Sequence, residues 1–376
     1  MRNKIFTVLG IFFALVLIIE ITGKNYVYKA IYYNYTKIDN PEIFANRVIL
    51  AENPEAFAKH KNYNKLPLPD ELNKELEALE TVSFLIIKND SVIHEKYWQD
   101  YDSNSISNSF SMAKSVTSIL CGIAIKEGYI ESVEDKVSKY LPSYLEHNRS
   151  DISIKDLLQM SSGLSWYESY GMPISDVTEA YYGTDLLSLI NRREVEQNAG
   201  KFHKYLSGDS QILGMVISRA VKKPLSVYAQ DRLWSRIGME TDALWSLDAQ
   251  EGEEKSYCCL HASARDFAKL GLLWMHSGNW KGNQLLDSAY VKASIKPINL
   301  PELDNPNKMV DYYGYQWWLT KHKEEFVYYM RGIHGQFVIC YPKQNIVIVR
   351  LGHKRGQKQK DAFKEVYNML KFADQI

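Results

Sequence analysis

Ser111 and Lys114 are the two residues of this chain whose types and spacing best suit covalent chemistry. They form an S-x-x-K pattern in a stretch, 103–121, that contains no Gly or Pro and repeats apolar residues at helical spacing. Three residues is close to one helical turn, so both side chains are expected on the same face. There a lysine amine that is kept neutral by burial or by its neighbours would take the proton of the hydroxyl. The backbone N–H groups at a helix start also favour negative charge. The spacing therefore predicts a nucleophilic serine that forms an acyl-enzyme.

The same pattern also arises where a surface serine caps a helix beside a solvated lysine, so the prediction depends on further partners. Tyr205 lies directly before an amphipathic helix expected at 211–220, and beside a lysine ammonium its phenol is expected to have a lowered pKa and to shuttle protons. Gly332 and Gly335 flank the start of a strand, whose close approach would add a second backbone N–H to that of Ser111 in an oxyanion hole. Each feature taken alone also fits ordinary packing or a hairpin turn.

The elements that must position these residues are strands at both ends of the chain and helices between them. A strand at 82–87, a turn and a strand at 92–98 form a predicted hairpin before the S-x-x-K helix. The segment 131–255 has a helical pattern, and further strands and a closing helix follow it. This order predicts an α+β fold, an antiparallel sheet flanked by helices with an inserted helical lobe. The expected divisions are a signal segment at 1–23, a stalk and lead-in helix at 24–80, and a catalytic domain at 81–376 with its lobe at about 131–255.

Composition excludes several classes of function. The 376 residues carry 45 basic and 45 acidic side chains, and this balance gives no indication of nucleic-acid binding. The four cysteines do not make a disulfide framework, and adjacent Cys258 and Cys259 lack the spacing of metal ligands. None of the nine histidines forms a metal-binding motif. We therefore expect no metal and no cofactor, and the sequence leaves the oligomeric state open.

The N-terminus has the pattern of a targeting segment. Arg2 and Lys4 precede an apolar run at 5–19, which is slightly short for a membrane span and rather long for the core of a signal peptide. No clear cleavage site follows, so we expect an uncleaved transmembrane signal-anchor, with a cleaved signal peptide as the alternative. In both cases the catalytic domain would lie outside the cytoplasm, either tethered to the membrane or secreted.

The order of the motifs resembles a known family. S-x-x-K at 111–114, Ser-Ser-Gly-Leu at 161–164, Tyr-x-Ser at 205–207, Ala-Arg-Asp at 264–266 and a Gly-rich strand at 332–336 together resemble the class C β-lactamase and penicillin-binding-protein-like serine hydrolases. The resemblance covers about 81–372. Tyr170, Tyr205, the Gln-Trp-Trp at 316–318 and the strand at 332–336 look like the branch that contains the 6-aminohexanoate-dimer hydrolase and the family VIII esterases.

This resemblance implies a β-lactamase/transpeptidase-like fold and a role for each matching residue. Ser111 would be the nucleophile and Lys114 its proton partner, and Tyr205 would help to activate the serine and protonate the leaving group. The amides of Ser111 and Ile333 would form the oxyanion hole. The residues expected to bind a small-molecule or peptide-like substrate are Tyr170, which would hold a leaving amine, Trp318, which would line the acyl pocket, and Ser207, His334 and Gln336.

Two departures from the family pattern guide the functional prediction. Tyr205-Leu206-Ser207 stands where β-lactamases and carboxypeptidases have Tyr-x-Asn, and Met330-Arg331-Gly332 stands where they have K-T-G. Both missing groups help to hold the substrate, whereas the acyl-transfer residues are intact. We therefore predict a serine hydrolase, an esterase or amidase acting on esters or small amides. The alternatives are a D-Ala-D-Ala carboxypeptidase or β-lactamase, and a catalytically idle, tethered ligand-binding domain.

Overall fold

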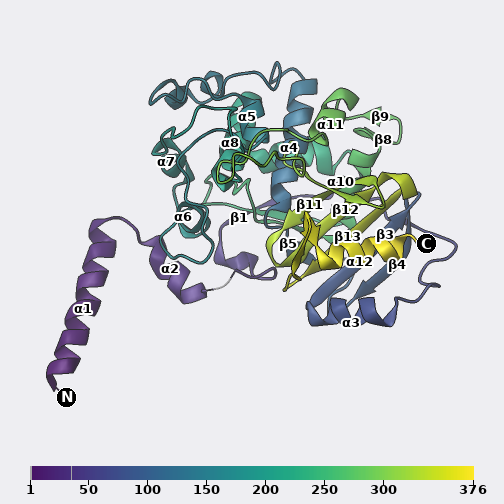
Figure 1. Cartoon of the computed structure of the whole chain (residues 1–376), viewed down its shortest axis with the longest axis horizontal. Coiled ribbons are helices and arrows are strands. Elements are labelled where there is room, and N and C mark those ends of the chain that lie inside the picture. The colour runs from purple at the N-terminus through teal and green to yellow at the C-terminus, as the bar shows by residue number, and fades with distance from the viewer. Residues whose placement is uncertain (1, 35) are drawn as a thin grey trace.

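The computed structural model describes residues 2–34 and 36–376, and its centre is a seven-stranded sheet. The order is β10-β11-β12-β13-β3-β4-β2, and every pair is antiparallel except that of β2 with β4 (Figure 1). The strands of this sheet are β2 (Ala58–Lys59), β3 (Thr81–Lys88), β4 (Ser91–Tyr97), β10 (Trp318–His322), β11 (Glu325–Gly332), β12 (Gln336–Tyr341) and β13 (Ile346–Gly352). The predicted antiparallel sheet and hairpin are thus present.

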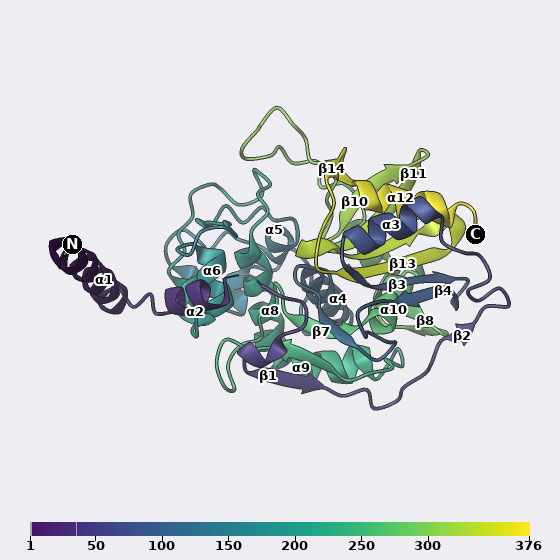
Figure 2. The same ribbon diagram turned by 90° about the horizontal axis from the view of Figure 1, so that it is seen from below.

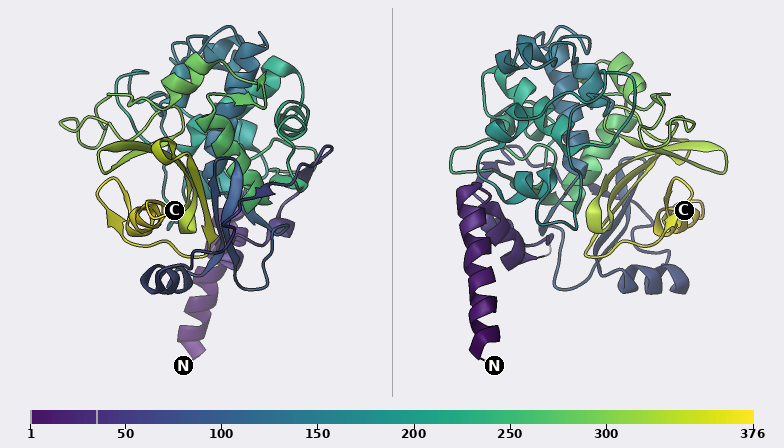
Figure 3. Two further views of the ribbon diagram at one scale, coloured as in Figure 1. Left: turned by 90° about the vertical axis from the view of Figure 1, so that its right-hand side faces the viewer. Right: turned by 60° about the vertical axis from the view of Figure 1, so that its left-hand side comes forward.

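Helices cover both faces of the sheet, which explains why its central strands are apolar throughout. Successive side chains of a strand point to opposite faces, and in β3 Leu85 and Ile87 join one hydrophobic core while Phe84 and Ile86 join the other. Figure 2 and Figure 3 show the resulting layers. The helices on the first face are α4 (Met112–Lys126) and α10 (Ala264–Met275), and those on the second are α3 (Asp70–Ala78) and α12 (Lys364–Ala373).

Helix α4 is buried on nearly all sides because it lies between the sheet and the helical lobe. The lobe lies within the predicted segment 131–255, and its helices are α5 (Ile154–Leu158), α6 (Asp176–Tyr182), α7 (Leu186–Asn191), α8 (Ser207–Val221) and α9 (Leu225–Ala229). A second, four-stranded sheet lies beside it and consists of β1 (Asn46–Ile49), β6 (Ala243–Ser246), β7 (Leu260–Ser263) and β5 (Ile106–Asn108). The remaining elements are α11 (Ser288–Ser294) and the small strand pairs β8 (Asn279–Trp280) with β9 (Asn283–Gln284) and β14 (Lys358–Gln359) with β15 (Ala362–Phe363).

The N-terminal helix α1 (Arg2–Ile21) stands away from the body of the protein (Figure 1). Across residues 2–34 and 36–376, the structure contains no helix whose length and apolar character suffice to cross a membrane. The predicted transmembrane signal-anchor is therefore not supported, and the location outside the cytoplasm stays a prediction.

Residues 24–80 do not form the expected stalk. Helix α2 (Tyr26–Tyr33) packs against α6 in the lobe, β1 pairs with β6, and β2 pairs with β4. Helix α3 lies where the lead-in helix was predicted and packs against α12. This segment is part of the body because its apolar side chains, such as Tyr26, Ile38 and Ile49, complete the hydrophobic core.

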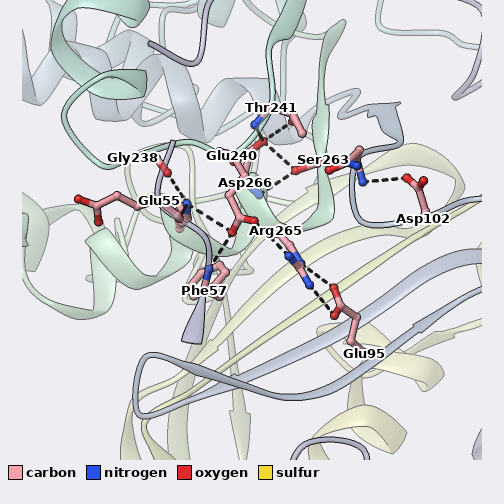
Figure 4. Close-up of polar contacts among 12 residues, drawn as sticks. Glu55, Phe57, Glu95, Asp102, Gly238, Glu240, Thr241, Ser263, Arg265 and Asp266 are labelled. Carbon is pink, nitrogen blue, oxygen red and sulfur yellow. Dashed lines mark hydrogen bonds and ion pairs between the residues drawn. The ribbon is translucent and has the colours of Figure 1, made fainter. Parts of the chain in front are cut away.

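The Ala-Arg-Asp motif at the start of α10 ties the two sheets together. Arg265 donates from Nε and Nη2 to both carboxylate oxygens of Glu95, at 2.7 and 2.8 Å, and from Nη1 to Glu240. Asp266 accepts from the hydroxyls of Ser263 and Thr241 (Figure 4). The guanidinium of Arg265 and the carboxylate of Asp266 both have their hydrogen-bond partners within this network. Its contribution is therefore to stability rather than to the chemistry of Ser111.

Candidate active site

Ser111 lies at the start of α4, on a turn that is held from both sides. It is the N-cap residue, and the preceding Phe110 has a φ of 44°, a left-handed conformation that is costly for a bulky residue. The turn is fixed because the side chain of Asn108 accepts from the N–H of Phe110 at 2.9 Å and the N–H of Ser109 donates to the carbonyl of Leu260 at 2.8 Å. The Ser111 hydroxyl is thereby presented to a cavity rather than to the helix end.

Lys114 lies one turn further along α4 and is only 1% exposed. Its Nζ donates to the Ser207 Oγ at 3.1 Å and to the Tyr257 carbonyl at 2.9 Å. Burial lowers the pKa of this amine to about 8, although the charges of Glu168 and Asp209 act in the opposite direction. With this pKa, Lys114 is mostly the ammonium at physiological pH, and roughly a fifth of the molecules carry the neutral amine that can accept a proton.

The two acceptors around Lys114 suit the neutral amine. A neutral lysine amine has two hydrogens and one lone pair, whereas the ammonium has three hydrogens and no lone pair. Ser207 and Tyr257 account for both hydrogens, which leaves the lone pair available for a further proton. The arrangement fits a general base on the helix that carries Ser111.

Tyr205 also lies beside the serine, but its pKa differs from the prediction. An interaction with the Ser111 hydroxyl and the charge of Arg331 act to lower the pKa of the phenol, yet burial outweighs both and raises it above its usual value. The Lys114 Nζ is 5.3 Å from the centroid of the Tyr205 ring. The expected lowered pKa was wrong because burial disfavours the phenolate. The phenol of Tyr205 is therefore neutral, and a neutral phenol is suited to donating a proton rather than to accepting one.

Glu168 connects the aromatic loop to this cluster, and sequence reasoning missed it. Its carboxylate accepts from the Ser207 N–H at 2.8 Å, the Ser207 hydroxyl at 2.6 Å and the Trp166 Nε1 at 2.7 Å, and from the Tyr170 hydroxyl. Ser207 is the first residue of α8, where a carboxylate also meets the positive end of the helix. The only signal in the sequence was an acidic residue among the aromatic residues at 166–170.

The Gly-rich turn after β11 approaches the serine as predicted. A Cβ on Gly332 would lie 2.3 Å from the carbonyl oxygen of Ser109, so only glycine permits this contact. The next residue, Ile333, lines the same cavity as Ser111, which is compatible with the predicted oxyanion hole. Gln336 instead lies beneath the turn, fully buried, and donates to the carbonyls of Ile333 and Gly352. The side-chain amide of Gln336 makes its hydrogen bonds within the protein, so this residue positions the turn and does not face substrate.

The cavity in front of Ser111 has a volume of about 470 Å³. Of the predicted substrate-binding residues, Tyr170, Ser207 and His334 line it. Trp318 is absent from the lining among the described residues. It packs against the Tyr205 ring, 5.4 Å away between centroids, with the Arg331 guanidinium over its other side at 3.2 Å. Trp318 thus supports Tyr205 from behind and does not form the cavity wall.

A disulfide between adjacent Cys258 and Cys259 also borders the cavity, and the sequence did not predict it. Cys259 has a φ of 66°, the left-handed backbone that accompanies this bond. Tyr257, whose carbonyl accepts from Lys114, directly precedes the pair. Elsewhere in the described ranges, 2–34 and 36–376, no group of three or more His, Cys, Asp or Glu residues could hold a metal ion.

The chain is similar in sequence to proteins that are already known. The family model described as Beta-lactamase matches residues 70–370. The 6-aminohexanoate-dimer hydrolase of Paenarthrobacter ureafaciens is 24% identical over 303 residues, which cover 76% of this chain and 75% of that protein. A protein of Escherichia coli (strain K12), provisionally named a D-alanyl-D-alanine carboxypeptidase, is 24% identical over 42% of each chain.

Solved structures share the fold at low sequence identity. A Bacillus anthracis protein, provisionally named a 6-aminohexanoate-dimer hydrolase, superposes with a TM-score of 0.73 at 19% identity, over 89% of this chain and 90% of that one. A penicillin binding protein from Bacillus halodurans superposes with a TM-score of 0.62 at 17% identity, over 80% of this chain and 99% of that one.

Proposed function

The chain belongs to the beta-lactamase family, and on that basis we propose that it is a serine hydrolase that cleaves esters or small amides through a covalent acyl-enzyme on Ser111. The observation that carries the proposal is the state of Lys114. This amine is buried one helical turn from Ser111, has a pKa of about 8, and donates to two neutral acceptors, the Ser207 hydroxyl and the Tyr257 carbonyl. A lysine whose role was only to form an ion pair would not be placed in this way.

The cluster supports a two-step reaction. In the first step the Ser111 Oγ attacks the substrate carbonyl carbon while its proton passes to Lys114, and the N–H groups of Ser111 and Ile333 stabilise the oxyanion. The tetrahedral intermediate then collapses, and the leaving alcohol or amine takes a proton through the Tyr205 phenol, which Lys114 re-protonates. In the second step water attacks the acyl carbonyl carbon and gives a proton to Lys114, and as the intermediate collapses the C–O bond to Ser111 breaks and Lys114 returns that proton to the Ser111 Oγ.

The substrate is proposed from what surrounds the cluster. Ser207 stands where an asparagine would orient a β-lactam or peptide side chain, and its hydroxyl is already occupied by Lys114 and Glu168. The P. ureafaciens relative is named for an amide substrate. We therefore favour esters and small amides over β-lactams and D-alanyl-D-alanine peptides.

The proposal is tested by labelling the full-length protein with a fluorophosphonate and, separately, with a fluorescent penicillin. The Ser111 Oγ displaces fluoride from phosphorus, and the adduct is located by mass spectrometry of peptides. Labelling of Ser111 by the fluorophosphonate alone supports an esterase or amidase, whereas labelling by both reagents revives the penicillin-binding alternative. If neither reagent modifies Ser111, the enzyme proposal fails and the idle binding domain remains.

Two variants sharpen the test. Lys114→Ala is expected to abolish labelling because it removes the base. Ser150→Ala, at an exposed serine outside the cavity lining, is the matched control and is expected to be labelled at the wild-type rate. If Lys114→Ala is labelled at the wild-type rate, Lys114 is not the base that activates Ser111.

A further inference from the structure

One wall of the cavity over Ser111 comes from a part of the chain that lies outside the family match. The match covers 70–370, yet Ala30, Ile31, Asn34 and Thr36 line the cavity. They belong to α2 and to the residues just after it, a segment that we call the N-terminal strap (residues 26–34 and 36). Figure 2 shows α2 lying against α6 of the lobe.

The strap is attached on both sides of the cavity. On the lobe side, Tyr26 and Val27 are buried in the core, and the Tyr33 ring stacks on Tyr182 at 6.1 Å between centroids with 6° between the planes. On the sheet side, the Thr36 Oγ1 is 3.2 Å from the Nε2 of His334, the residue next to Ile333. The strap therefore spans from the helical lobe to the oxyanion turn and forms part of the site.

The cavity that the strap completes is uncharged. Its lining contains no Asp, Glu, Lys or Arg side chain among the described residues. Burial lowers the pKa of His334, so this imidazole is neutral at physiological pH. The residues of the lining that are predominantly apolar are Ala30, Ile31, Phe110, Met172, Pro173, Val177, Tyr181, Tyr182 and Ile333. A carboxylate or ammonium on the bound part of a substrate would lose its hydration there without gaining an ion-pair partner among the lining residues.

We propose that the N-terminal strap completes an acyl-binding pocket that selects esters with an uncharged, apolar acyl group. The proposal rests on the proposed function, and it assigns Tyr170, which lines this cavity, to the acyl side instead of to the leaving amine that the family resemblance implied. Ile31 lies at the mouth, two-thirds exposed, and Ala30 lies deeper. A volume of about 470 Å³ falls within the range of small-ligand sites. Each methylene that enters such a pocket is worth about a four-fold gain in kcat/KM.

The test measures kcat/KM of the full-length protein on p-nitrophenyl esters from acetyl to octanoyl, and on the mono-p-nitrophenyl ester of succinic acid. We expect kcat/KM to rise with chain length up to the limit of the pocket. The succinyl ester, whose acyl group ends in a carboxylate, is expected to be hydrolysed at least about ten-fold more slowly than the butyryl ester.

Variants of the strap test whether its side chains cause the selectivity for the acyl group. Ile31→Trp and Ala30→Trp are expected to lower the ratio of kcat/KM for hexanoyl and octanoyl esters to that for the acetyl ester about ten-fold or more. The matched control is Tyr32→Trp, because Tyr32 lies on the same helix but is 82% exposed and is not part of the lining. It is expected to keep the wild-type chain-length profile.

Several outcomes would overturn the proposal: an unchanged chain-length profile in both tryptophan variants of the wall, the same change in Tyr32→Trp, or equal rates on succinyl and butyryl esters. These outcomes differ from those expected if the proposed serine hydrolase function itself is wrong. In that case the fluorophosphonate would not label Ser111, or Ser111→Ala would hydrolyse esters at the full rate, and neither result depends on the strap.

Discussion

The Lys114 Nζ lies 3.1 Å from the Ser207 Oγ, although the two residues are 93 positions apart in the chain. Ser207 has a single hydroxyl hydrogen, which it donates to Glu168 at 2.6 Å, so it can only accept from the lysine. The amine is thus connected to a carboxylate through one hydroxyl rather than by direct contact. This connection keeps the amine in place while burial lowers its pKa.

The first prediction is a rise of kcat/KM with pH. With a pKa of about 8, Lys114 is mostly ammonium at pH 6 and cannot accept the Ser111 proton, whereas above pH 8 it is mostly neutral. We expect an ascending limb in kcat/KM with its midpoint at about pH 8, measured with an ester whose own hydrolysis is subtracted. A rate that falls as pH rises through this range would show that the ammonium is the active form.

Glu168→Gln should shift the midpoint of the ascending limb of kcat/KM to lower pH. The carboxylate of Glu168 raises the pKa of Lys114, so its removal lowers that pKa further. The readout is the midpoint of the kcat/KM profile, which a merely structural role would not shift. Glu146→Gln, at an exposed carboxylate, serves as the control and should keep the wild-type midpoint. A shift toward higher pH would contradict the assigned effect of Glu168.

Tyr205→Phe should lower kcat/KM by about 10²- to 10⁴-fold, the range for a lost general acid. The ring can keep its packing on Trp318, so the thermal transition should change little. Tyr312→Phe is matched to it, since that ring also stacks on Trp318, at 6.1 Å, but its hydroxyl contacts Glu302. Equal losses in both variants would mean that the effect comes from packing and not from the phenol at Ser111.

Arg265→Met should destabilise the protein without removing the nucleophile. It leaves the carboxylate of Glu95, which is 4% exposed, without its guanidinium partner, at a cost of about 3–5 kcal/mol in the free energy of unfolding. Urea denaturation measures this cost, and the fluorophosphonate should still label Ser111 in the folded fraction. The double variant E95L/R265M should recover part of the loss, because it removes the unpaired charge. If the single variant unfolds at the wild-type midpoint, the network of Figure 4 does not stabilise the fold.

Reduction of the Cys258–Cys259 disulfide should slow acylation. The bond constrains the backbone next to Tyr257, whose carbonyl holds Lys114, and Cys258 faces the cavity, where a dithiol can reach it. A two-electron reduction by a dithiol, which becomes a cyclic disulfide, should lower kcat/KM on the order of ten-fold. The variant C258S/C259S should be insensitive to the reagent, and the buried thiols Cys121 and Cys340 lie outside the lining. Equal loss in that variant would place the effect elsewhere.

Local patterns in the sequence were sufficient for most of the scaffold. The segments 82–87 and 92–98 identify strands β3 and β4, and the amphipathic pattern of 211–220 identifies helix α8, because strand and helix periods differ along the chain itself. Strand β11 was missed, and residues 24–80 were mistaken for a stalk. The partners of residues 24–80, such as β6 and helix α6 of the lobe, are distant in sequence, so pairing and burial there leave no local signal, whereas β11 adjoins both of its partners, β10 and β12.

The sequence by itself determined the S-x-x-K helix, the order of the motifs that identifies the family, and the glycine that lets the Ile333 turn approach Ser111. These follow from helix spacing and from the lack of a side chain, which are properties of short segments. Only the tertiary structure decided the roles of Glu168, Ser207, Trp318 and Gln336, the raised pKa of Tyr205 and the strap over the cavity. Each of these depends on burial and on contacts between segments far apart in the chain, and it is burial that decides whether a phenol or an amine keeps its charge.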